Sequence, residues 1–225
     1  MTSLGAWVGL ALALAPGVNR EAAIERNNQA FAAIHQDHLA QAESLAQEAL
    51  TIARQALPAG DPLVAAILNN LAQAERLQGN YLDAEKHYRA AIAIWETALG
   101  KQHPDTARGL MNLAALYHER GREAGAEDLY RRANAVFEEA YGKMNPLSLV
   151  TRNELGEVLR AEGRVSEAER LTRETLEPLK QILGDHDSRV IRALANYARL
   201  LKQTHHGAEA AAVRNRINGQ AAAFR

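Results

Sequence analysis

A spacing of 42 residues recurs along the 225-residue chain, and this repeat constrains the fold more than any other feature of the sequence. Asp61-Pro62, His103-Pro104 and Asn145-Pro146 each open a segment of helical apolar periodicity, and each lies 42 residues after the previous one. Asp187-Ser188 continues the series, and a weaker copy begins at Asn19. Self-similarity at a fixed period is typical of arrays in which each unit stacks on its neighbours. We therefore expect one repeat domain over residues 19–225, with units starting near residues 19, 61, 103, 145 and 187.

Each unit has the start and stop signals of two helices joined by a tight turn. The opening Asp or Asn can cap a helix, and the proline that follows suits the first helical position. Gly79, Gly121 and Gly163 share one repeat position, where glycine permits the positive φ that ends the first helix. The second helix has a small residue at one position in every unit, as close antiparallel helices require: Ala42, Ala84, Ala126, Ala168 and Ala210. Together with an aromatic content of only 5%, this pattern predicts an all-α protein.

The third unit carries the most complete motif, which consists of Leu110, Leu113, Ala114, Tyr117, Gly121, Ala126, Tyr130 and Ala133 in order. This order resembles the tetratricopeptide repeat (TPR), in the 42-residue class found in kinesin light chains. The end units depart from the motif, with Gln29 at the leucine position and His205 at the glycine position. The resemblance covers about residues 19–220. It implies an α-solenoid of about five helix pairs, wound as a right-handed superhelix whose concave face binds a peptide or protein segment.

Asparagines recur on the helix face that a stacked array would turn toward its concave side. One repeat position holds Asn28, Asn70, Asn112 and Asn196, the fourth unit has Glu154 there, and Asn69 is adjacent. An amide offers two donors and an acceptor, which suits the backbone of an extended peptide. In the family that the chain resembles, asparagines at this position often bind such a ligand. The alternative is that these amides hydrogen-bond between adjacent first helices and hold the stack together.

Cations share this face, and with the asparagines they complete the predicted ligand-binding set: Arg76, Arg108, Arg160, Arg192, Arg199 and Lys202. Such a strip would favour a ligand with acidic side chains or a free carboxylate. Glu119, Glu154 and Glu157 lie on the same face and favour the alternative of a solvated, mixed-charge surface. The predicted partner is a protein or peptide, with an acidic ligand as one expectation.

Composition and motifs argue against other functions. Lys plus Arg (26) nearly balance Asp plus Glu (27), so there is no global attraction for nucleic acid. The chain has no cysteine, which excludes thiolate metal sites, and the spacing of its eight histidines matches no recognised metal site. Trp95 and Phe137, 42 residues apart, are expected to pack between units. We expect a non-catalytic scaffold without metal or cofactor; the alternative is a structural part that associates with itself or a larger complex.

The apolar run from Leu4 to Ala15 is too short for an ordinary membrane span but has the length of a signal-peptide core. Ala11 and Ala13 offer an A-x-A-like cleavage site, whereas no Lys or Arg precedes the run and Pro16 disfavours cleavage after Ala15. Residues 1–18 are therefore either a signal peptide or a helix that caps the fold. The first alternative predicts export or a periplasmic location, and the second a cytoplasmic one.

Overall fold

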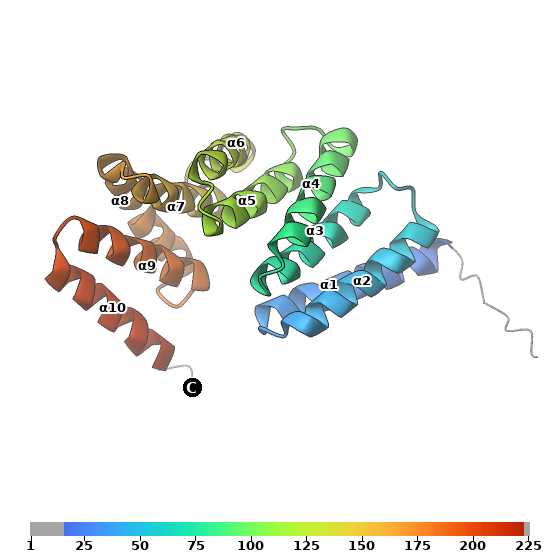
Figure 1. The fold of residues 1–225 in the computed structure, drawn as a ribbon, viewed down its shortest axis with the longest axis horizontal. Coiled ribbons are helices and arrows are strands. Elements are labelled where there is room, and N and C mark those ends of the chain that lie inside the picture. The colour runs from blue at the N-terminus through green and yellow to red at the C-terminus, as the bar shows by residue number, and fades with distance from the viewer. Residues whose placement is uncertain (1–15, 223–225) are drawn as a thin grey trace, which may run out of the picture.

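The computed structural model describes residues 16–222, and in this range the chain forms ten α-helices. They are α1 (Pro16–His35), α2 (Leu39–Ala56), α3 (Pro62–Leu77), α4 (Tyr81–Ala98), α5 (Pro104–Glu119), α6 (Glu123–Tyr141), α7 (Pro146–Ala161), α8 (Val165–Leu183), α9 (Ser188–Gln203) and α10 (Gly207–Ala222). Consecutive helices form five hairpins that stack into a curved array (Figure 1). The predicted all-α solenoid of five helix pairs is confirmed. We call the odd-numbered helices the A helices and the even-numbered ones the B helices.

The predicted caps start the A helices. The side chain of Asp61 accepts a hydrogen bond from the backbone N–H two residues later at 2.8 Å, and those of Asn145 and Asp187 do so at 2.9 Å. His103 has the same role, since its Nδ1 accepts from the N–H of Asp105 at 3.1 Å. Each cap satisfies one of the backbone donors that a helix start leaves free, which fixes where each repeat begins.

The turn between the two helices of a unit has a left-handed residue at one repeat position. Gly79, Gly121 and Gly163 adopt φ values of +86°, +68° and +80° there, as predicted. In the first and last units the same position holds Asp37 (φ +60°) and His205 (φ +63°). A left-handed conformation costs a non-glycine residue about 1–2 kcal/mol. The two end units therefore keep the turn geometry of the inner units without the residue that suits it.

The small residues predicted for the B helices are buried in the helix packing and are at most 2% exposed: Ala42, Ala84, Ala126, Ala168 and Ala210. The aromatic residues at repeat spacing lie in the core, where Tyr88, Tyr130 and Phe137 are fully buried. These side chains therefore pack between units, as expected from their spacing, and the A helices turn their remaining face toward the concave side.

α1 begins at Pro16, three residues before Asn19, so residues 16–18 of the apolar N-terminal segment belong to the first helix. Residues 1–15 lie outside the described part of the chain, and the alternatives of a signal peptide and a capping helix fall there. Between residues 16 and 222, no helix is both long and apolar enough to cross a membrane.

Candidate functional site: the concave face of the A helices

Three hydrogen bonds between asparagine side chains join neighbouring A helices. Nδ2 of Asn70 on α3 donates to Oδ1 of Asn27 on α1 at 2.9 Å. The same bond recurs at two other junctions, at 2.9 Å from Asn112 to Asn69 and at 2.7 Å from Asn196 to Asn153. In each pair the donor lies 43 residues after the acceptor, which is one position more than the repeat length. These are the contacts that the interhelical alternative predicts, and ligand binding by the same side chains stays a prediction.

Two of the three acceptors, Asn27 and Asn153, are absent from the set predicted from the sequence. The sequence does contain a pattern that could have identified them, since asparagine also recurs at positions 27, 69 and 153, one residue before the predicted repeat position. Both acceptors are buried, and Asn153 is only 2% exposed. Asn28 differs from the other ladder members because no described A helix precedes α1, and it is exposed without a hydrogen-bond partner among residues 16–222.

The series of amide bonds is interrupted between α5 and α7. Met111 stands at the acceptor position and Glu154 at the donor position, and neither side chain has an N–H to donate. Instead, Sδ of Met111 lies 3.4 Å from Oγ1 of Thr151, whose single hydrogen is shared with the closer backbone carbonyl of Leu147 at 2.7 Å. Burial raises the pKa of Glu154, and the charge of Arg192 partly opposes that rise. A carboxylate thus replaces an amide in the middle of the concave face.

A groove of about 570 Å³ runs along the concave face between α1, α3 and α5. Its apolar lining includes Phe31, Leu63, Ala66, Trp95 and Met111, and its polar lining includes Asn28, Asn70, Gln73 and Asn112. Asn28 and Gln73 have no hydrogen-bond partner within the described range, so their donors and acceptors are free to meet a ligand. Arg20 and Arg108 also line the groove; Arg20 contacts Asp61 at 2.7 Å, and Arg108 lies 3.6 Å from Asp105.

The predicted cations do not form an unpaired basic strip. Arg76 pairs with Glu119, and Arg160 and Arg199 both contact the buried Glu157, at 2.9 and 2.7 Å. The exposed Arg192 and Lys202 have no hydrogen bond or ion pair in the part of the chain that the structure describes. Because carboxylates of the protein itself pair with four of the six predicted cations, Arg108 included, the preference for an acidic ligand stays a prediction.

Nothing in residues 16–222 groups three or more His, Asp or Glu side chains in a way that could hold a metal ion. The site therefore consists of amides, apolar side chains and paired charges. Such groups are suited to holding a ligand by shape and hydrogen bonding.

Two family models described as tetratricopeptide repeat match the sequence, one over residues 63–139 and the other over residues 148–188. Together they cover more than half of the 225 residues. Among curated proteins, none matches this sequence.

Solved structures of similar fold include the nearly identical TPR-like repeats of a protein described as a kinesin light chain from Podosopora anserina. It is 20% identical, covering 93% of this chain and 98% of that chain, with a TM-score of 0.67. BtubC (BKLC) from P. vanneervenii is 21% identical over 93% of this chain and 90% of its own, with a TM-score of 0.67. The apo form of RapI is 10% identical over 90% and 71%, with a TM-score of 0.68. At these identities the likeness concerns the fold. Repeat spacing, family models and fold thus agree that the chain belongs to the tetratricopeptide repeat family.

Proposed function

We propose that the protein is a non-catalytic scaffold whose concave groove binds an extended segment of a partner protein. The TPR fold is a scaffold that commonly mediates protein–protein interactions, and members of the family are generally non-catalytic. The observation that carries the finer proposal is the groove between α1, α3 and α5, which combines an apolar floor with amide groups that the protein leaves unused.

The amides suit a peptide backbone, which presents an N–H and a C=O at almost every residue. Asn28 and Gln73 are free to donate and to accept. Asn70 and Asn112 each donate one N–H to the preceding A helix, which leaves the carbonyl oxygen and the second N–H for a ligand. Because that bond fixes the orientation of the amide, a ligand would meet groups that are already ordered, and the entropy lost on binding is reduced.

The apolar floor suits the side chains of the same segment. Successive side chains of an extended peptide point to opposite sides, so every second residue would face the floor. Phe31 is 49% exposed and gives the floor an accessible aromatic surface. A volume of about 570 Å³ lies within the range of natural ligand sites.

Charge adds a secondary preference. Arg20 and Arg108 line the groove with side chains that are 46% and 51% exposed, so an acidic ligand residue would meet them in water. Such exposed pairs contribute only about 0.2–1 kcal/mol. The proposal therefore depends on the amides and the apolar floor rather than on the cations.

The test is selection of peptides from a random displayed library by the full chain, followed by measurement of the affinity of the enriched peptides. Ala66→Arg would block the groove, and it should be tolerated because Arg108 and Arg192 occupy the same repeat position in the third and fifth units. The double variant N28A/Q73A removes free amides without touching the bonds between helices. Lys86→Ala, at an exposed residue of α4 outside the groove, is the control.

We expect Ala66→Arg and N28A/Q73A to bind the enriched peptides at least about tenfold more weakly than the unchanged protein does. The melting temperatures of both variants should stay close to that of the unchanged protein. Methylation of single backbone nitrogens in the peptide should weaken binding as well, because it removes a donor. Peptides that bind both groove variants as well as they bind the Lys86→Ala control would refute the proposal.

The alternative of a self-associating structural part makes a different prediction. Light scattering over a concentration series would then show a mass that rises with concentration. A constant monomer mass contradicts self-association and leaves groove binding intact.

A further inference from the structure

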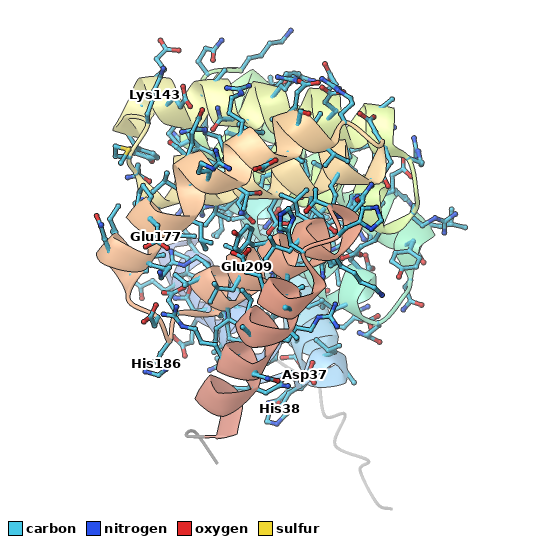
Figure 2. All side chains as sticks on the ribbon, turned by 90° about the vertical axis from the view of Figure 1, so that its left-hand side faces the viewer. Asp37, His38, Lys143, Glu177, His186 and Glu209 are labelled. Atoms are coloured by element: carbon cyan, nitrogen blue, oxygen red, sulfur yellow. The ribbon has the colours of Figure 1, made fainter. Side chains whose placement is uncertain are left out.

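A second cavity of about 280 Å³ lies at the C-terminal end of the solenoid, between α8, α9 and α10. It shares no lining residue with the concave groove, so it is a separate feature of the molecule. Figure 2 presents this end of the solenoid, with α10 in front, and labels two of the lining carboxylates, Glu177 and Glu209.

At the last junction, a smaller side chain replaces the tyrosine that stands at the two preceding junctions. Tyr88 on α4 and Tyr130 on α6 occupy one repeat position and are 0% and 1% exposed. On α8 that position is Thr172, which is much smaller and lines the cavity. Tyr197 on α9 lines the same cavity and donates its hydroxyl hydrogen to Oε1 of Glu209 at 2.8 Å.

The same junction has also lost a cation. At the two preceding junctions, a glutamate on one B helix pairs with an arginine just before the next B helix: Glu85 with Arg122 at 2.9 Å and Glu127 with Arg164 at 2.8 Å. The equivalent residues at the last junction are Glu169 and His206, and the structure shows no ion pair between them. Glu169 keeps only its pair with Arg173 on the same helix, at 2.6 Å. Glu169, Arg173 and His206 all line the cavity, so a second positive charge supplied from outside would take the place of the missing arginine.

A buried polar group points to the same kind of ligand. Thr172 is 4% exposed, and its hydroxyl has no hydrogen-bond partner among residues 16–222. The hydroxyl oxygen is therefore free to accept a hydrogen bond from a ligand that has a donor. Leu176 and Leu200 supply apolar surface beside it.

We propose that this cavity binds a primary alkylammonium group, such as the lysine side chain of a partner protein. The methylene stem would lie against Leu176 and Leu200, as long basic side chains lie along apolar surface. The ammonium group has three N–H donors, which match the hydroxyl of Thr172 and the carboxylates of Glu169 and Glu209. This inference goes beyond the groove and does not depend on it.

The test uses n-butylammonium, which is the lysine side chain without its backbone, titrated into the full chain and followed by NMR. We expect saturable shifts at Thr172, Leu176 and Leu200. The neutral isostere n-butanol should bind at least about tenfold more weakly, because it lacks the charge. Equal binding of the two probes, or tighter binding of n-butylguanidinium, would overturn the proposal.

Matched variants locate the site. Thr172→Tyr restores the residue that the inner units have and should abolish binding without lowering the melting temperature. Glu209→Gln keeps an oxygen that accepts the hydrogen bond from Tyr197. It should weaken the binding of n-butylammonium about three- to tenfold, because it removes one partly solvated negative charge. Glu167→Gln, the same change one unit earlier and outside the cavity, should alter the affinity less than about twofold. Unchanged affinity in Glu209→Gln would refute the site even if Thr172→Tyr did not fold.

Discussion

Replacing Asn70 by alanine tests whether the asparagine bonds hold adjacent A helices together. Asn70 and its acceptor Asn27 are each 9% exposed, and their side chains are joined at 2.9 Å. A neutral hydrogen bond contributes about 0.5–1.5 kcal/mol, and a buried group left without its partner adds a penalty of about 1–3 kcal/mol. We therefore expect Asn70→Ala to lower the free energy of unfolding by about 1–3 kcal/mol.

The control is Asn28→Ala, because Asn28 is exposed and has no partner in the described chain. Its effect should stay within about 0.5 kcal/mol, as for other surface substitutions. Urea denaturation followed by circular dichroism measures both variants, and comparison of the midpoints requires equal slopes. Adding Asn27→Ala completes a double-mutant cycle, for which we expect a coupling energy of about 1 kcal/mol.

An Asn70→Ala variant as stable as Asn28→Ala, or a coupling energy near zero, would refute the idea that the asparagine bonds hold adjacent A helices together. The asparagine pairs would then contribute nothing to the stack. The recurrence of the same hydrogen bond at three junctions would then need another explanation, such as ligand binding alone.

Three further predictions concern the turns, the interruption of the asparagine series and the charges. Gly79→Ala should lower the free energy of unfolding, measured by thermal denaturation, by about 1–2 kcal/mol because φ is positive at this residue. Asp37→Gly, at the same repeat position, should raise the free energy of unfolding by up to about 1 kcal/mol. The double variant M111N/E154N should introduce the missing asparagine bond, and a double-mutant cycle should give a favourable coupling of about 1 kcal/mol, which a value of zero would contradict. Burial alone would raise the pKa of Glu127, but hydrogen bonds from two arginines hold it below its usual 4.5. Because the pKa is lower in the folded state, Glu127 stabilises the fold above about pH 4.5, and this contribution is lost as the pH falls through the folded value. Glu127→Gln should therefore flatten the loss of stability in acid, and an acid limb as steep as that of the unchanged protein would contradict this.

The fold was predictable from the sequence because its determinants are local. Caps such as Asp61, turn glycines such as Gly79 and small packing residues such as Ala84 act within a few residues of their own helix, and they recur in register. Periodicity then dictates that equivalent positions lie side by side. The burial of Tyr88 and Phe137 follows from the same reasoning.

The candidate site was predictable only in part. The donor Asn70 follows from the repeat, but its acceptor Asn27 lies 43 residues away, and that offset depends on how neighbouring A helices are staggered. The 42-residue period of the sequence gives no information on how far neighbouring A helices are shifted along each other. The same offset pairs Arg76 with Glu119, so a cation predicted to be free is neutralised across a junction.

The cavity at the C-terminal end was also not predicted, although the residue changes beside it are visible in the sequence. Thr172 stands where the second and third units have tyrosine, and His206 stands where the third and fourth units have arginine. Departures from a repeat consensus near the end of an array are readily ascribed to capping, and the volume beside them is apparent only from the packed structure.

Whether the stacked asparagines bind an extended ligand can be measured by NMR of their side-chain amides during titration with a library-selected peptide. We expect the Nδ2 resonances of Asn28, Asn70 and Asn112 to shift and saturate together, while that of Asn196, outside the groove, does not move. Shifts confined to the B helices, with these three amides unchanged, would contradict the claim that stacked repeats form a concave amide surface for an extended ligand.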